Sequence, residues 1–173
     1  MKHETIFSPC REYRYTLWRE WLIGDGYAMF ICLNPSTADE TRDDPTIRKC
    51  VGFAKRWGYS ALCMTNLFAY RATDPRKMKA CHKPIGTEND KWLIACAKEA
   101  RVIIAAWGDH GEFMGRNEEV LKLIDGLDCL KFTKHHNPSH PLYLPYTLRP
   151  DFVGAEQVKQ NRVVERQKEL SDA

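Results

Sequence analysis

The chain lacks the cysteine spacing that is typical of metal-binding or disulfide-rich proteins. Its seven cysteines are spread singly, and no Cys-x-x-Cys pair occurs. Structural zinc and iron–sulfur sites normally use closely paired cysteines, and an odd number of cysteines argues against a disulfide framework. Most of these cysteines stand in apolar segments, so we expect small buried hydrophobic residues in a reducing compartment.

Three motifs of common enzyme classes are also missing. The sequence contains no G-x-x-x-x-G-K-[ST] phosphate loop, no G-x-G-x-x-G dinucleotide fingerprint and no G-x-S-x-G nucleophile elbow. These absences disfavour nucleotide hydrolysis by a P-loop and serine hydrolase chemistry. We expect no cofactor.

Long hydrophobic runs and a strong net charge are absent as well. The apolar runs are far shorter than a membrane span, and Met1-Lys2-His3-Glu4 begins no signal peptide. We therefore expect a cytoplasmic protein without a membrane partner. The formal net charge of +3 permits an anionic partner but does not require one. The oligomeric state is left open.

Alternating apolar segments and helix signals predict an α/β fold. Residues 13–22 and 27–33 are predicted strands, and Gly24-Asp25-Gly26 between them predicts a hairpin. Asp43-Asp44-Pro45 carries the acidic cap and early proline of a helix start, and that helix should end at Gly58. Further strands are expected at 61–67, 102–107 and 127–132, and further helices at 86–97 and 117–127.

This order is typical of a mainly parallel sheet covered by helices on both faces. A chain of 173 residues usually forms one domain. We expect a single α/β domain over residues 1–153. The polar tail, residues 154–173, is expected to be a peripheral helix or to fray.

Two Asn-Pro-Ser segments about a hundred residues apart are the most informative feature. Asn34-Pro35-Ser36 and Asn137-Pro138-Ser139 each follow a predicted strand. In open α/β sheets, ligands bind beyond the carboxyl ends of the strands, and an asparagine amide both donates and accepts hydrogen bonds. The alternative is that Asn-Pro only ends a strand with a turn. The repetition favours two loops that face one cleft.

Other strand-end residues add candidates for this cleft. Asp39 could act as a general base, whereas Asp43 and Asp44 are better explained as helix caps. Phe68 could stack on a flat base or belong to the core, and Arg71 could meet a phosphate. His140, inside the second motif, is expected to face the cleft.

A metal site is the main alternative chemistry. Asp39 and Asp109 could combine with a histidine cluster, namely His110, His135, His136 and His140. No pair of these histidines has the i, i+4 helical spacing of a zinc enzyme. We therefore predict no metal ligand.

Three segments resemble a known family. They are Leu33–Asp39, Asp44–Arg48 and Thr65–Pro75, and they resemble the bacterial and phage family called domain of unknown function 1643. The likeness covers roughly Phe7 to Phe152. The family label implies no particular activity.

A more distant resemblance is to the uracil-DNA glycosylase superfamily. Cys32–Ser36 is similar to its early motif, which reads Gly-Ile-Asn-Pro-Gly in the mismatch-specific branch, and Asn137–Leu142 resembles its late motif. The likeness implies a three-layer α/β/α sandwich with a mostly parallel central sheet. Cys32 and Ser36 replace two glycines of the early motif, and His140-Pro141 replaces a small residue of the late one.

The resemblance also implies roles for particular residues. Asn34, with Asp39, would orient a water toward the sugar C1′, and Asn66 would read the base edge. Asn137, Ser139 and His140 would engage phosphate or the departing base. The candidate catalytic residues are thus Asn34, Asp39 and His140, and the candidate ligand-binding residues are Pro35, Ser36, Asn66, Phe68, Arg71, Asn137 and Ser139.

The sequence therefore predicts a protein that recognises or processes a nucleobase, nucleotide or DNA, by N-glycosidic bond hydrolysis if it is an enzyme. Two other hypotheses stay open. One is a non-catalytic module that binds a nucleotide or a modified base, and the other is a metal-dependent hydrolase.

Overall fold

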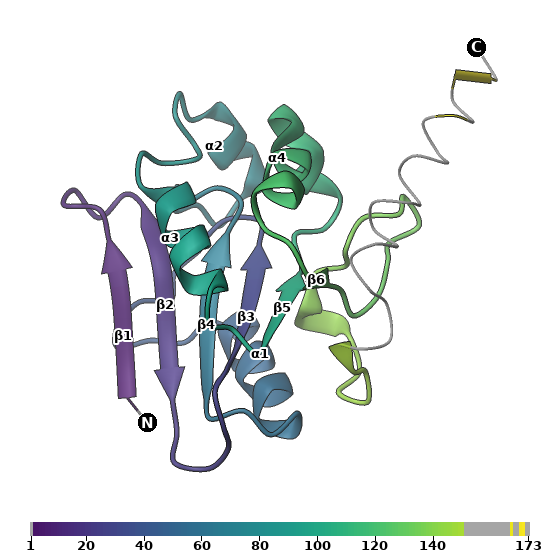
Figure 1. Ribbon diagram of the computed structural model, residues 1–173. Helices are drawn as coiled ribbons and strands as arrows, with labels where there is room; N and C mark the ends of the chain where they lie inside the picture. Colours follow the sequence, from purple (N-terminus) through teal and green to yellow (C-terminus); the bar gives the residue numbers. More distant parts are fainter. Residues whose placement is uncertain (1, 151–166, 168–169, 172–173) are drawn as a thin grey trace.

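The computed structural model describes residues 2–150, 167 and 170–171, and it has the predicted α/β fold. One six-stranded sheet has the order β1-β2-β4-β3-β5-β6 (Figure 1). Most of the predicted tail, residues 154–173, lies outside the described residues. The strands are β1 (Lys2–Phe7), β2 (Arg14–Glu20), β3 (Tyr27–Cys32), β4 (Ala61–Asn66), β5 (Val102–Ala105) and β6 (Leu127–Asp128).

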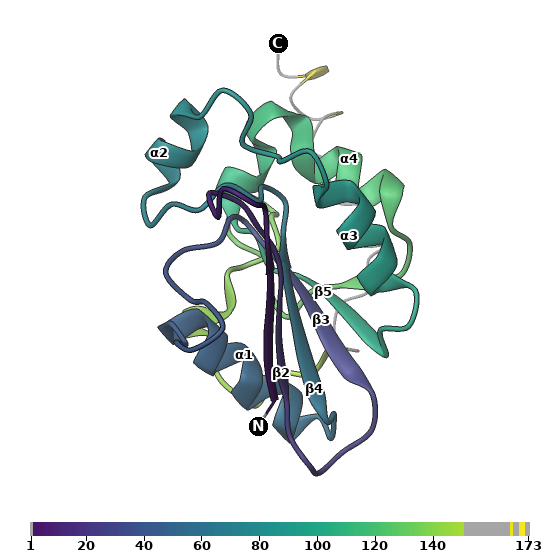
Figure 2. The ribbon, with the colours of Figure 1, turned by 90° about the vertical axis from the view of Figure 1, so that its left-hand side faces the viewer.

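Helices lie on both faces of the sheet. They are α1 (Pro45–Arg56), α2 (Pro75–Ala80), α3 (Asn89–Ala97) and α4 (Arg116–Leu123), with short 3₁₀ helices η1 (Asp109–Gly115) and η2 (Pro141–Tyr143). Figure 2 shows α1 on one side of the sheet and α3 and α4 on the other. Side chains alternate along β3 because successive residues of a strand face opposite sides: Met29 packs in the core under α3 and α4, and Phe30 packs in the core under α1.

The sheet is mixed. Strands β4, β3, β5 and β6 pair in parallel, whereas β1 pairs with β2 and β2 with β4 in antiparallel fashion. The prediction of a mostly parallel sheet is therefore not confirmed, because β1 and β2 add an antiparallel part to the parallel strands. Strand β1 was not predicted, because its first residues are polar and exposed at the edge.

The predicted hairpin between residues 13–22 and 27–33 is wrong. Strand β4 lies between β2 and β3 and pairs with both of them. All six residues of β4 are buried, and a strand buried on both faces needs neighbours on both edges to satisfy its backbone groups.

Local capping sets the ends of the predicted helix after Asp44. Oδ1 of Asp44 accepts a hydrogen bond from the Ile47 N–H (2.9 Å), and Pro45 begins the helix. Trp57 is the C-cap, and Gly58 follows with φ +88°, a conformation that favours glycine. Both ends agree with the prediction. Helix α2 was not predicted, and β6 is shorter than the predicted strand 127–132.

Candidate functional site

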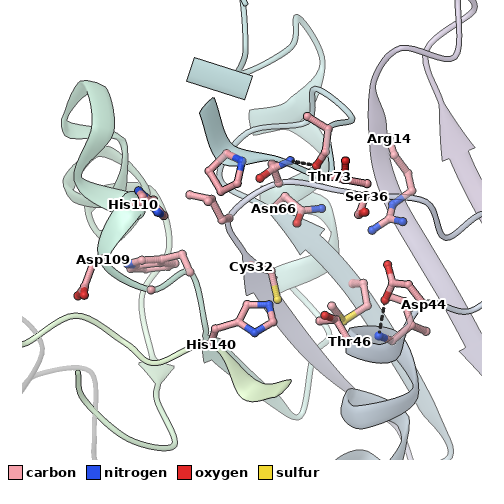
Figure 3. A pocket seen from close by; sticks show the side chains of 18 residues that line it. Arg14, Cys32, Ser36, Asp44, Thr46, Asn66, Thr73, Asp109, His110 and His140 are labelled. Atoms are coloured by element: carbon pink, nitrogen blue, oxygen red, sulfur yellow. Dashed lines mark hydrogen bonds between the residues drawn. The ribbon is translucent and has the colours of Figure 1, made fainter. Parts of the chain in front are cut away.

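A cavity of about 360 Å³ opens where the parallel strands β3, β4 and β5 end (Figure 3). Loops after each of these strands contribute to its wall, together with the start of β2, the start of α1 and the loop before η2. The lining residues are Arg14, Cys32, Leu33, Asn34, Ser36, Asp44, Thr46, Ile47, Met64, Asn66, Ala72, Thr73, Pro75, Trp107, Gly108, Asp109, His110 and His140.

Asn66, the last residue of β4, presents an unused amide to this cavity. The residue is 2% exposed, and its Nδ2 has no hydrogen-bond partner among the described residues. Its backbone carbonyl accepts a hydrogen bond from Nδ2 of Asn89 (2.9 Å), which fixes the strand end. Because buried polar groups normally have partners, the Asn66 amide is a candidate ligand contact at this cavity.

Arg14, the first residue of β2, brings a buried positive charge to the same cavity. Nη1 donates to the Ala38 carbonyl (2.8 Å), and Nε has no partner among the described residues. Burial lowers the pKa of Arg14 to about 10, and the Asp44 carboxylate acts in the opposite direction. The guanidinium therefore stays charged at neutral pH.

Asp44 combines a structural and a chemical feature. Oδ1 caps α1 through the Ile47 N–H, while no described residue donates to Oδ2. Asp44 lines the cavity, with Arg14 above it and Thr46 beside it in Figure 3. One carboxylate oxygen is therefore available to a water or a ligand.

His140 reaches the cavity from the loop after β6. The Leu142 N–H donates to Nδ1 of His140 (3.3 Å), so the neutral ring carries its proton on Nε2. Surrounding protein atoms lower the pKa of His140, and the nearby Asp44 carboxylate opposes that shift. The ring is therefore neutral at pH 7 and has one N–H to donate.

Asn34 and Ser36 line the cavity from the loop after β3. Nδ2 of Asn34 donates to the carbonyls of Ala72 (2.7 Å) and Pro35 (3.1 Å). The Pro35 carbonyl accepts a hydrogen bond from the Ala72 N–H (2.9 Å). Asn34 thus joins the loops after β3 and β4 and forms part of the cavity wall, whereas Pro35 is buried outside it.

Comparison with known proteins identifies a family. A family model described as "Protein of unknown function (DUF1643)" matches residues 14–142. The chain belongs to this family. The DUF1643 match includes all 18 residues that line the cavity, from Arg14 to His140. No curated protein and no solved structure matches the chain.

The DUF1643 fold places Asp39 outside the residues that line the cavity. Oδ1 of Asp39 accepts hydrogen bonds from the backbone N–H groups of Thr41 and Arg42 (2.8 Å each) and from the Thr41 hydroxyl (3.0 Å). The Thr41 N–H is the largest cause of the lowered pKa of Asp39. Asp39 therefore holds a turn. Asp44, for which we predicted only a capping role, lines the cavity instead.

The two asparagines of the Asn-Pro-Ser segments do not share the cavity. Nδ2 of Asn137 donates to Oδ1 of Asp109 (3.2 Å) and Oε1 of Glu112 (3.1 Å), so its amide braces η1. The backbone N–H of Ser139 donates to the Lys131 carbonyl (2.8 Å), and Ser139 does not line the cavity. The second segment contributes His140 instead. This geometry differs from the predicted meeting of Asn34 and Asn137.

Phe68 and Arg71 also lie outside the cavity lining. Phe68 is completely buried and packs against Phe113, with 5.7 Å between ring centroids, so it belongs to the core. Arg71 donates to the Arg11 carbonyl (3.1 Å), and its guanidinium lies 4.7 Å from the centre of the Phe7 ring.

Asp109, His110 and His140 of the metal hypothesis line the cavity, but they do not form a set of metal ligands. Asp109 accepts hydrogen bonds from the Thr133 hydroxyl (2.5 Å) and from Asn137, and Nδ1 of His110 lies 3.0 Å from Nζ of Lys79. Within the described ranges, no three His, Cys, Asp or Glu side chains form a group that could hold a metal ion. No helix in the same ranges is long and apolar enough to span a membrane.

Arg14 is a charged cavity residue that we did not predict from the sequence. The available signal was a charged residue among the apolar residues of strand β2, which reads Arg-Tyr-Thr-Leu-Trp-Arg-Glu. A charged side chain in a buried strand needs a partner. A charged residue in a predicted buried strand is therefore a candidate for an ion pair or for a ligand contact.

Proposed function

We propose that the cavity binds a nucleobase. The observation that carries this proposal is the unpartnered amide of Asn66, which lines a cavity of about 360 Å³. An asparagine amide offers one acceptor and two donors, which suits the mixed donor and acceptor edge of a base. The volume lies within the range of small-molecule sites, about 300–1,000 Å³.

The apolar walls support a flat ligand. Trp107 is 2% exposed and lines the cavity, and so do the apolar side chains of Ile47 and Met64. Nε1 of Trp107 also lacks a partner among the described residues. Polar donors at the edge and apolar surfaces beside them are the features that a planar heterocycle requires.

The reaction that we propose is hydrolysis of the N-glycosidic bond. A water oxygen bonds to the sugar C1′, the C1′–N bond breaks, and its electron pair leaves with the base. The water gives its proton to Oδ2 of Asp44, and the departing base is protonated from solvent. Nε2–H of His140 donates a hydrogen bond to the departing base. Asp44 thus takes the role that we first predicted for Asp39.

The resemblance to uracil-DNA glycosylases supports the same proposal. Asn34 and His140, which belong to the two short motifs of that resemblance, both line the cavity. We propose on this basis that the fold is related to the α/β/α sandwich of that superfamily and that the protein acts in the cytoplasm, where it meets nucleotides and nucleic acid.

The test uses oligonucleotides that carry uracil, mismatched bases or modified bases. We expect abasic sites with wild-type protein and a strong decrease with Asp44→Asn, and we expect base-dependent binding to be lost with Asn66→Ala. Binding without abasic sites at high protein concentration would reduce the function to recognition. Neither binding nor cleavage across the panel would overturn the proposal.

A further inference from the structure

Three arginines are buried in the described part of the chain, and one of them has no ion-pair partner. Arg19 is completely buried and pairs with Asp43 (Nε to Oδ1, 2.8 Å). Arg116 is 2% exposed and pairs with Asp90 and with Glu119 (3.1 Å to Glu119). Arg14 is equally buried, yet no described carboxylate lies within ion-pair distance of it.

The hydrogen bonds of Arg14 are also incomplete. Nη1 donates to the Ala38 carbonyl, and Nε has no partner among the described residues. Figure 3 shows the guanidinium turned into the cavity beside Ser36, with Asp44 below it. A buried charge without a paired counter-ion is strongly destabilising. Such a cost is typical of a site where a ligand supplies the missing charge.

We propose that Arg14 binds a phosphate group of the ligand. This inference deepens the proposed function and rests on it: the ligand is a nucleotide, free or within a strand, and not a free base or nucleoside. The planar guanidinium presents several N–H donors in a geometry that matches phosphate oxygens. The Ser36 hydroxyl lines the cavity next to it and adds a further donor.

The two polar side chains thus have different tasks, although they come from neighbouring strands. Asn66, at the end of β4, contacts the base, and Arg14, at the start of β2, contacts the phosphate. Asp44 carries a negative charge near Arg14, so an isolated inorganic phosphate gains less there than a phosphate that the base also anchors. The base and the phosphate must therefore be joined for tight binding.

The experiment compares four ligands by calorimetric titration: nucleosides, the matching 5′-monophosphates, ribose 5-phosphate and inorganic phosphate. We expect the monophosphates to bind at least about tenfold more tightly than the nucleosides. Arg14→Gln should remove that advantage and leave nucleoside affinity unchanged. Arg56→Gln, which replaces an exposed arginine at the far end of α1, should behave as wild type.

A stability measurement separates binding from a structural role. Arg14→Met removes the unpaired buried charge, so its melting temperature should equal or exceed that of wild type. A marked decrease in melting temperature for both Arg14 variants, with nucleosides and monophosphates weakened equally, would overturn the assignment.

The remaining outcomes distinguish this inference from the proposed function. Nucleosides that bind as well as their monophosphates would overturn the role of Arg14 and leave nucleobase recognition intact. Ribose 5-phosphate that binds through Arg14, while no nucleoside binds, would support the phosphate site and overturn nucleobase recognition. A folded protein that binds none of the four ligands at millimolar concentration would overturn both.

Discussion

At the scale of single residues, two buried asparagines differ in what their amides contact. Asn137 is 1% exposed, and its Nδ2 donates hydrogen bonds to both Asp109 and Glu112. Asn66 is 2% exposed, and its Nδ2 has no partner among the described residues. An amide that the protein itself uses contributes to stability, whereas an unused amide is available for binding.

We therefore expect Asn66→Ala to weaken mainly binding and Asn137→Ala to lower mainly stability. Asn66→Ala should weaken nucleotide binding at least about tenfold and change the free energy of unfolding by less than about 1 kcal/mol, because no internal hydrogen bond of its side chain is lost. Asn137→Ala should cost about 1–3 kcal/mol of stability, because two carboxylates lose a donor. Chemical denaturation and calorimetric titration of both variants measure this. Equal loss of stability in both would contradict it.

His140 should make stability depend on pH. Its pKa in the folded protein lies below the ordinary value of 6.5, first because neighbouring protein atoms partly desolvate the ring, although the residue keeps part of its surface exposed. At His140 the unfolded chain therefore binds a proton more readily than the folded chain does. The contribution of His140 to the free energy of unfolding is fully present above pH 6.5 and is lost as the pH falls through the folded pKa.

His140→Asn should reduce this loss between pH 7.5 and pH 5, as measured by urea denaturation at each pH. Asp109 also makes stability depend on pH, but in a different pH range from His140. Burial tends to raise its pKa, but hydrogen bonds from Thr133 and Asn137 outweigh that effect and hold it below 3.8. Its contribution is therefore lost only in more acidic solution. Parallel stability curves for wild type and His140→Asn would contradict the prediction.

At the scale of secondary structure, Asp44 at the start of α1 has two roles, a helix cap and the proposed general base. Asp44 caps the helix with Oδ1 and leaves Oδ2 to the cavity. Asparagine caps helices about as well as aspartate does, but its side chain cannot accept a proton from water. The two roles of Asp44 can therefore be separated by substitution.

Asp44→Asn should lower the rate of base release by at least about 100-fold, the scale of general-base catalysis. Its loss of stability should stay within about 1 kcal/mol, the scale of a charge at a helix N-terminus. Asp44→Ala should lose the cap as well, which costs about 1 kcal/mol more. Single-turnover kinetics and thermal denaturation compare the two variants. Full activity of Asp44→Asn would remove Asp44 from the mechanism.

At the scale of the whole molecule, basic and acidic residues nearly balance. The sequence has 26 lysines and arginines and 23 aspartates and glutamates. Binding that relies on a broad basic surface releases many counter-ions and is strongly weakened by salt. If the proposed ligand is part of a nucleic-acid strand, we expect the protein to contact that strand at only a few phosphates within and around the cavity.

The affinity for a short single-stranded oligonucleotide should therefore depend weakly on salt. With one or two phosphates bound, the slope of log affinity against log salt should be about −1, since each phosphate contributes about −0.7 in single strands. Fluorescence anisotropy between 50 and 200 mM salt, as order-of-magnitude conditions for such titrations, measures the slope. A slope of about −4 or steeper would indicate an extended basic surface instead.

The sequence by itself determined the features that depend on neighbouring residues. Asp44-Pro45 begins α1 because the cap bonds the N–H of Ile47, three residues away. Apolar runs marked β3, β4 and β5, and parallel strands bring their ends together. For that reason three residues that we named from the sequence as site candidates, Asn34, Asn66 and His140, line one cavity.

Only the tertiary structure decided which of the candidate side chains form hydrogen bonds or packing contacts within the protein itself. Asp39 and Asn137 are bound by groups of their own loops and of η1, and Phe68 is packed in the core. The insertion of β4 beside β2 brings Arg14 to the cavity and makes the sheet mixed. These outcomes depend on contacts between segments far apart in the chain. A local pattern specifies which hydrogen-bonding groups a residue has, but the packing of distant segments determines which of those groups remain for a ligand.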